Sequence, residues 1–134
     1  MKTSSAKAKG RRAAQEVRQL ILDIHPELKA DDVQVTPSGV TGEDLKLSPA
    51  ARDLLPIAIE CKNVEKLNIW KALEQAESHS AEFEPVLFFK RNRGKLYAAV
   101  DATVLLVLIK NTMTVVASGL ADVDFETPKG GTKH

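Results

Sequence analysis

The segment IAIECK, residues 57–62, decides the fold expected for this chain. Ile57, Ile59 and Cys61 stand at alternate positions of this segment. Because successive side chains of a strand point to opposite faces, these apolar residues share one face, and Glu60 and Lys62 share the other. The segment therefore predicts a strand with one face in the core and one face that carries a carboxylate next to an amine.

Two shorter strands are expected before this segment. Residues 32–36 (DVQVT) alternate in polarity, Pro37-Ser38-Gly39 is typical of a turn, and Leu45-Lys46-Leu47 alternates again after Gly42. These two runs predict neighbouring strands, with Asp44 immediately before the second one. Residues 49–55 are compatible with a short helical turn.

Helices are predicted on both sides of these strands. From about Arg12 to Ile24, apolar residues recur at helical spacing until Pro26 ends the run. Glu16 lies about 40° from Leu20 on the helical wheel, at the edge of the apolar stripe. A second helix is predicted from an N-cap at Asn68 to about His79.

The last third of the chain predicts two strands and at least one further element. Residues 85–89 and 96–100 read as strands joined by a basic connection at residues 90–95. Asp101 is a candidate cap for a helix to about Lys110, although Val104–Ile109 is equally compatible with a buried strand. Met113–Ala117 is a further candidate strand.

The 134 residues, 43% of them hydrophobic, suit one domain. We expect a flexible basic arm at residues 1–10, the folded domain at 11–121 and a loose tail at 122–134. The single cysteine, Cys61, cannot form an internal disulfide, which favours a reducing, cytoplasmic location. The longest aliphatic run, Val104–Ile109, is too short to cross a bilayer, and no secretory signal is evident.

The predicted order of elements, αβββαβ, resembles that of the PD-(D/E)XK nuclease superfamily. The motif is Gly42-Glu43-Asp44 followed by Ile59-Glu60-Cys61-Lys62, and the resemblance extends over residues 11–100. It implies an α/β fold with a restriction-endonuclease-like core, in which helices flank a mixed central sheet. The proline that often precedes the aspartate in this superfamily is absent here, where Glu43 stands before Asp44.

Within that superfamily the chain is most similar to archaeal-type and phage-encoded Holliday junction resolvases. The similarity rests on the basic N-terminus, on Glu16 in the first helix, on Ser38 before the aspartate and on Gln75 in the second helix. It implies catalytic roles for these three side chains. Each also has an ordinary alternative, since Glu16 can pair with Arg11 or Arg12, Ser38 can be a turn former and Gln75 can be a surface residue.

Phosphodiester cleavage explains the choice of residue types. Mg²⁺ can neutralise the phosphate, activate water and stabilise the leaving oxygen, and it usually takes one or two carboxylates. Asp44 and Glu60 are expected to supply them, and Mn²⁺ is expected to substitute. The resemblance adds the carbonyl oxygen of Cys61, and Glu16 as a holder of water or of a second ion. Lys62 is expected to hydrogen-bond the attacking water or the phosphate.

The expected partner is DNA in a bacterial or phage-infected cytoplasm, and the substrate implied by the resemblance is a four-way junction, resolved by paired nicks. The chain has one such motif and no internal repeat, so two nicks require a homodimer. Basic residues of two segments are candidate phosphate contacts: Lys7, Lys9, Arg11, Arg12, Lys90, Arg91, Arg93 and Lys95.

Other interpretations of the sequence stay open. A Glu-x-Lys pair alone is common at solvated strand ends, and the basic segments can simply aid solubility. The alternatives are a PD-(D/E)XK nuclease that acts on linear or forked DNA, a DNA-binding protein of the nuclease fold without turnover, and a structural domain in which Glu60 and Lys62 are surface charges.

Overall fold

The computed structural model describes residues 4–126, which form nine helices and strands and one short 3-10 turn. The order of elements matches the αβββαβ pattern expected for residues 11–100, with a short helix inserted before the third strand. The elements are α1 (Ser4–Ile24), η1 (Ala30–Asp32), β1 (Val33–Val35), β2 (Leu45–Leu47), α2 (Pro49–Leu54), β3 (Ile57–Asn63), α3 (Ile69–Ser78), β4 (Glu84–Lys90), β5 (Tyr97–Ala99) and α4 (Ala102–Ala117).

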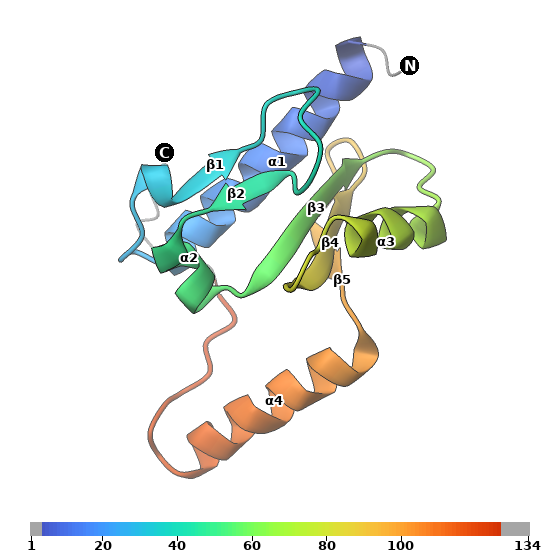
Figure 1. The fold of residues 1–134 in the computed structure, drawn as a ribbon. Helices are drawn as coiled ribbons and strands as arrows, with labels where there is room; N and C mark the ends of the chain where they lie inside the picture. The colour runs from blue at the N-terminus through green and yellow to red at the C-terminus, as the bar shows by residue number, and fades with distance from the viewer. Residues whose placement is uncertain (1–3, 127–134) are drawn as a thin grey trace.

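The strands form two sheets, so the structure is a mixed α/β fold (Figure 1). In the first sheet β1 pairs antiparallel with β2. In the second, β4 lies between β3, its parallel partner, and β5, its antiparallel partner. A single central sheet was expected, and the structure instead divides the strands between these two sheets. The sheets adjoin near the start of β2, where the Asp44 N–H donates to the Ile59 carbonyl at 2.9 Å.

Helix α1 packs on the face of β3 that was predicted to be apolar. Ala13, Val17 and Ile21 of α1 are buried in one cluster with Ile59 and Cys61 of β3. Burial of this helical stripe against alternating strand residues supplies the main apolar driving force for the fold. The opposite face of β3 therefore remains for α3, which also contacts β4.

The structure corrects two boundaries. Helix α1 begins at Ser4 rather than near Arg12, so the expected flexible arm is helical from Ser4 to Gly10, where small residues continue the helix. Helix α4 extends to Ala117, so the strand predicted for Met113–Ala117 is wrong, as is the strand alternative for Val104–Ile109. In the predicted tail, residues 122–126 have no regular secondary structure, and residues 127–134 lie outside the described residues.

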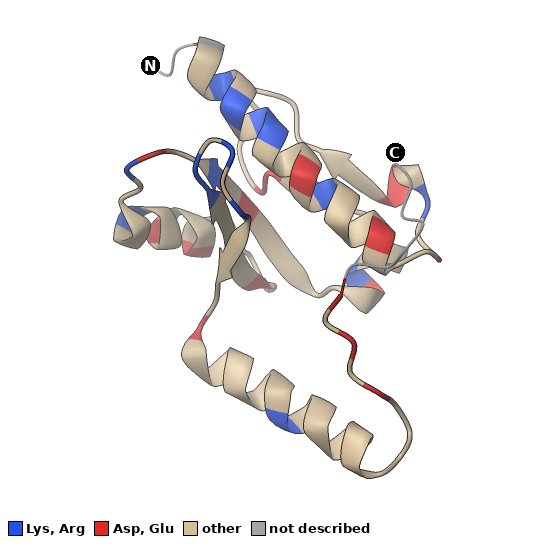
Figure 2. Ribbon diagram, turned by 180° about the vertical axis from the view of Figure 1, so that it is seen from behind, with Lys and Arg blue, Asp and Glu red and all other residues tan. Residues whose placement is uncertain are grey.

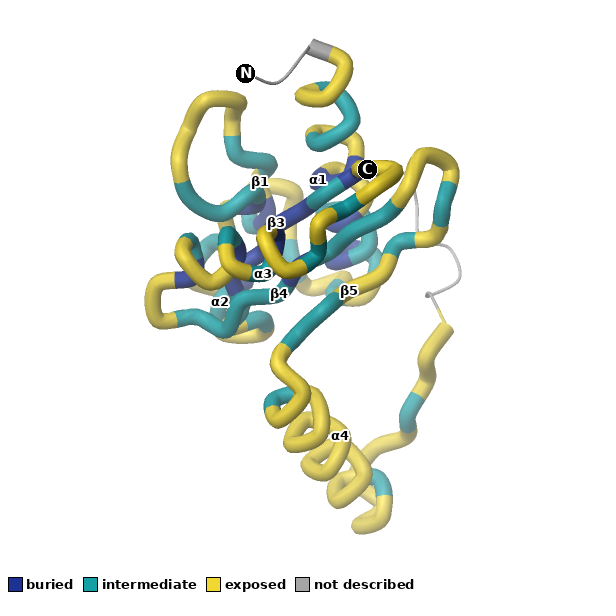
Figure 3. Tube along the Cα trace, turned by 90° about the vertical axis from the view of Figure 1, so that its right-hand side faces the viewer, coloured by how far each residue is buried: buried dark blue, intermediate teal, exposed yellow. Residues whose placement is uncertain are grey.

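Helix α4 projects away from the two sheets (Figure 3). Asp101 caps it as predicted, its carboxylate accepting from the N–H groups of Thr103 and Val104. None of the sixteen residues of α4 is buried, although most of them are apolar. Within residues 4–126, no helix is both long enough and apolar enough to cross a membrane.

Candidate active site

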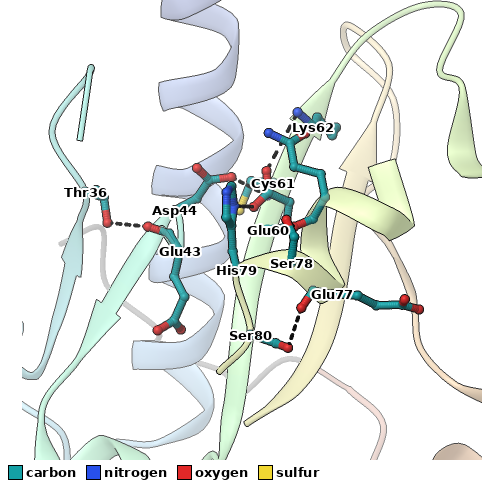
Figure 4. A network of polar contacts seen from close by, with 11 residues as sticks. Thr36, Glu43, Asp44, Glu60, Cys61, Lys62, Glu77, Ser78, His79 and Ser80 are labelled. Atoms are coloured by element: carbon teal, nitrogen blue, oxygen red, sulfur yellow. Dashed lines mark hydrogen bonds and ion pairs between the residues drawn. The ribbon is translucent and has the colours of Figure 1, made fainter. Parts of the chain in front are cut away.

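Asp44 is fixed beside β3 by two hydrogen bonds. Its backbone N–H donates to the carbonyl of Ile59, and its carboxylate Oδ2 accepts from the N–H of Cys61 at 2.7 Å (Figure 4). The N–H and C=O of one strand residue point toward the same strand edge, so the carbonyl of Cys61 also faces the Asp44 side. One carboxylate and one carbonyl oxygen are thereby brought to the same edge of β3.

Glu60 and Lys62 lie on the face of β3 opposite the α1 core, as the alternation of the segment predicted. Glu60 is only 3% exposed. Its Oε2 lies 3.7 Å from the Nζ of Lys62, and its Oε1 lies 3.3 Å from the Nδ1 of His79 at the end of α3. The Lys62 ammonium group and the His79 ring therefore each contact one oxygen of the buried Glu60 carboxylate (Figure 4).

The surroundings of Glu60 penalise its charge. Burial raises the pKa of this carboxyl above its usual range, and the nearby negative charge of Asp44 raises it further. The hydrogen bond from His79 and the charge of Lys62 act in the opposite direction without cancelling the increase. A pair of neighbouring carboxylates with incomplete compensation is an arrangement to which an added cation is attracted.

A hollow of about 400 Å³ opens over these side chains. It is lined by residues from α1, from the β1–β2 connection, from β3 and from α3, so it gathers segments that are distant in the sequence. Most of the predicted site residues line it, together with one additional histidine: Lys7, Arg11, Ser38, Asp44, Glu60, Cys61, Lys62, Gln75 and His79.

Ser38 and Arg11 meet at the rim of this hollow. The Nη1 of Arg11 donates to the Oγ of Ser38 at 3.2 Å, which links α1 to the turn after β1. Gly39, the next residue, has a φ of 85°, a conformation that glycine adopts without strain. Ser38 thus occupies the turn predicted for it and also lines the pocket, where its hydroxyl accepts its hydrogen bond from Arg11.

Glu16 does not line the hollow that contains Asp44 and Glu60. Its Oε2 accepts from the Nζ of Lys90 at 2.7 Å, and it borders a separate hollow of about 550 Å³. Glu16 follows Arg11 by five positions along the helix, so its side chain points about 140° away from the pocket side of α1. The structure therefore does not bring Glu16 to the candidate metal ligands.

The predicted basic residues gather at one end of the molecule, where the first half of α1 lies near the β4–β5 connection (Figure 2). They are divided among three hollows. Lys7 and Arg11 line the hollow of Asp44, and Arg12, Lys90 and Arg93 line the hollow of Glu16. Arg91 and Lys95, again with Lys90, line a third hollow, while the Lys9 carbonyl accepts from the Nδ2 of Asn63.

Cys61 contributes its backbone to the site and its side chain to the core. The side chain is 6% exposed and belongs to the cluster beneath α1. Burial raises the pKa of its thiol strongly, and the charges of Asp44 and Glu60 raise it further. The thiol is therefore a small apolar group of the core, and not a nucleophile.

Two features of the site were missed at the sequence level. His79 was assigned no role in the site from the sequence, although its spacing of four from Gln75 places both on one face of the helix. Arg52 of α2 pairs with Glu43 at 2.6 Å, donates to the Ile57 carbonyl at 2.5 Å and stacks on the Phe83 ring. Arg52 thus ties α2 to Glu43, which precedes Asp44, and to the start of β3, which carries Glu60.

The site offers few protein ligands to a metal ion. In residues 4–126 there is no group of three or more His, Cys, Asp and Glu side chains arranged to hold a metal ion. Mg²⁺ usually takes only one or two carboxylates. Asp44, Glu60 and the carbonyl of Cys61 are the oxygen groups that could hold such an ion. Comparison of the chain with protein-family models, with curated proteins and with solved structures finds no match.

Proposed function

We propose that this chain is a Mg²⁺-dependent endodeoxyribonuclease of the PD-(D/E)XK type, built on a restriction-endonuclease-like core. The observation that carries the proposal is the position of Asp44 and Glu60 in one hollow with Lys62. Lys7 and Arg11 line the same hollow, so its acidic floor has a basic rim. A cation on the floor and a phosphate at the rim would satisfy both charge patterns.

Asp44, Glu60 and the carbonyl of Cys61 are the groups that would hold the metal. Bound there, Mg²⁺ would supply Lewis acidity, which reduces the charge on the phosphate and favours ionisation of a water molecule. Mn²⁺ accepts the same oxygen ligands and would replace it. Since Glu16 lies in another hollow, we assign it no part in this first set of ligands.

The side chains around these ligands have separate roles. Lys62 would donate a hydrogen bond to the phosphate or to the attacking water, because its ammonium group lies within 4 Å of the buried carboxylate of Glu60. His79 would keep the Glu60 carboxylate in place through Nδ1. Ser38 and Gln75 line the same hollow and offer uncharged polar groups to the DNA backbone.

We further propose four-way junction DNA as the preferred substrate and a homodimer as the active form. Eight basic residues spread over α1 and the β4–β5 connection extend well beyond the hollow of Asp44. Such an area suits contacts to several phosphates of a branched DNA. A PD-(D/E)XK nuclease that acts on linear or forked DNA is the alternative, and a substrate panel separates the two.

The metal assignment is tested by removing one charge at a time. Asp44→Asn and Glu60→Gln should each abolish Mg²⁺-dependent cleavage, because each removes a formal charge from a set with only two carboxylates. Asp53→Asn and Glu82→Gln, at exposed positions, are the matched controls and should cleave normally. Cleavage that persists in EDTA, or normal rates in both site variants, contradicts the assignment.

A further inference from the structure

Helix α4 carries an apolar surface that the described chain leaves uncovered. Its central side chains are exposed by 42% to 64%, for example Leu106 at 64% and Leu108 at 57%. No strand or other helix within residues 4–126 makes an extensive contact with it. A helix that is apolar around most of its circumference is normally enclosed by other protein, and α4 is too short to cross a membrane.

The distribution of side chains shows how much of α4 needs to be covered. At about 100° per residue, Thr103, Lys110, Asn111 and Thr114 lie in one polar stripe about 100° wide, which also contains Val107, and apolar residues cover the remaining arc of about 220°. Thr112 lies within this apolar arc, but its hydroxyl donates to the carbonyl of Leu108. A helix packed on one neighbour buries an arc of about 100°, so the apolar arc needs two neighbouring surfaces.

The area of the arc leads to the same requirement. A helix of 16 residues is about 24 Å long and about 10 Å across, so the apolar arc offers about 450 Å². A stable interface between two proteins buries about 800 Å² on each partner. Pairing of two α4 helices alone therefore falls short by nearly half, and further apolar surface has to take part.

The sheet offers such a surface beside α1. Phe88 of β4 is only half-buried, although it packs against the core cluster. Ala98 of β5 lies directly opposite Phe88 on the same face and is exposed, and Val86 is half-buried two residues away. We call these three residues the β4–β5 strip. Since β5 leads into α4 through only Val100 and Asp101, the strip and the helix are neighbours along the chain.

We propose that α4 is a dimerisation helix, which packs on α4 and on the β4–β5 strip of a second copy of this chain. Each copy presents one convex apolar helix and one open apolar strip. A two-fold arrangement therefore covers both surfaces of both copies and closes the assembly. The polar stripe with Lys110, the one charged residue of α4, stays in water. This inference deepens the homodimer of the proposed function by assigning its interface, and it is argued from the apolar surface of α4 and the strip, independently of the nuclease chemistry.

The experiment is a measurement of molecular mass by sedimentation velocity, with the full chain at micromolar concentration. The wild type should sediment as a dimer. Ile109→Glu, in the apolar arc, should weaken association by about a hundredfold or more, because the dimer would bury an unpaired carboxylate. Thr114→Glu introduces the same group on the polar stripe and should remain a dimer. Ala98→Arg tests the β4–β5 strip. Its side chain is exposed in the single chain, so the change should weaken association without disturbing the fold.

Circular dichroism should show all three variants folded, which ties any loss of mass to the interface. A monomeric wild type overturns the proposal. Binding of that monomer to phospholipid vesicles would show that α4 contacts lipid, and protection of its α4 amides from hydrogen exchange would show that α4 folds back on its own sheet. A dimer that survives both Ile109→Glu and Ala98→Arg overturns it too. Equal dissociation by Thr114→Glu and Ile109→Glu contradicts the proposed orientation of α4.

Discussion

Glu60 is a carboxylate in surroundings that penalise its negative charge. Because folding raises its pKa, Glu60 contributes most to stability at acid pH, where it is neutral, and that contribution is lost as pH rises through the folded-state pKa. Asp32 has the opposite effect on the pH dependence of stability. The hydrogen bond from Ser48 lowers its pKa, so its contribution is present at neutral pH and is lost as pH falls through the folded-state pKa. Comparing the wild type with a Glu60 variant isolates the contribution of Glu60.

Glu60→Gln should therefore raise the melting temperature of the metal-free protein at neutral pH. The expected rise is about 4 °C, the change that about 1 kcal/mol produces in a domain of this size. The difference from the wild type should disappear at acid pH, and Mg²⁺ should stabilise only the wild type. Thermal melts at two pH values, with Glu82→Gln as the exposed control, measure this. A Glu60→Gln protein that melts below the wild type at neutral pH contradicts the description of the site.

Lys62 should matter for turnover more than for binding. Lys62→Ala should reduce the cleavage rate by about a hundredfold, as expected for one preorganised charged donor, with little change in DNA affinity. Lys66→Ala, at an exposed lysine four residues away, should leave the rate unchanged. Single-turnover kinetics at saturating protein separate the two effects. If Lys62→Ala lowers affinity and rate to the same extent, Lys62 is a binding residue.

For single residues, the two-residue alternation of a strand was sufficient to predict that Glu60 and Lys62 share one face and that Cys61 lies in the core. The same alternation could not predict which distant segments contact each other. The bond from the Cys61 N–H to Asp44 joins residues 17 positions apart, and the pair of Glu16 with Lys90 joins residues 74 apart. The partners of Glu16 and His79, which are Lys90 and Glu60, could not be predicted because they depend on packing that local spacing does not encode.

Among the elements, α2 has a larger role than its six residues suggest. Arg52 joins it to Glu43, next to Asp44, and to Ile57 at the start of β3. Arg52→Ala should lower the free energy of unfolding by about 2 to 3 kcal/mol, because the mostly buried Glu43 carboxylate loses its cation. Arg52→Lys keeps the charge without the planar fork and should lose less. Denaturant unfolding measures both variants, and equal losses would show that charge is not the reason.

The boundaries of α1 and α4 show which local signals were available. The lysines before Gly10 suggested a disordered arm, but Ala6 and Ala8 favour continuation of the helix. Gly119, with a φ of 78°, ends α4 by a Schellman motif, in which the N–H groups of Gly119 and Leu120 donate to the carbonyls of Val116 and Val115. Gly119 is therefore a helix C-terminal signal that can be recognised in the sequence. The β-branched residues of α4, in contrast, favoured the wrong prediction of a strand.

For the whole molecule, charge is segregated rather than absent, because a net charge of +1 conceals a basic end. Neutralising Arg91 and Arg93 together should weaken DNA binding and reduce its salt dependence by about 0.9 in log-log slope for each lost phosphate contact. Lys29 and Lys46 lie outside the predicted basic set, and neutralising them together is the matched control. Binding isotherms at several salt concentrations measure the slope, and an unchanged slope for the Arg91 and Arg93 variant would mean that these residues do not contact phosphate.

The central claim is that this chain cleaves branched DNA with the metal held by Asp44 and Glu60. Its most direct test is cleavage by the full-length protein of a matched panel, namely a four-way junction, a fork, a linear duplex and a single strand, all in Mg²⁺. We predict paired nicks in the junction, much slower cleavage of the other substrates, and no cleavage by Glu60→Gln. Equal cleavage of duplex and junction would contradict the junction preference, and no cleavage of any substrate in Mg²⁺ or Mn²⁺ would contradict the nuclease itself.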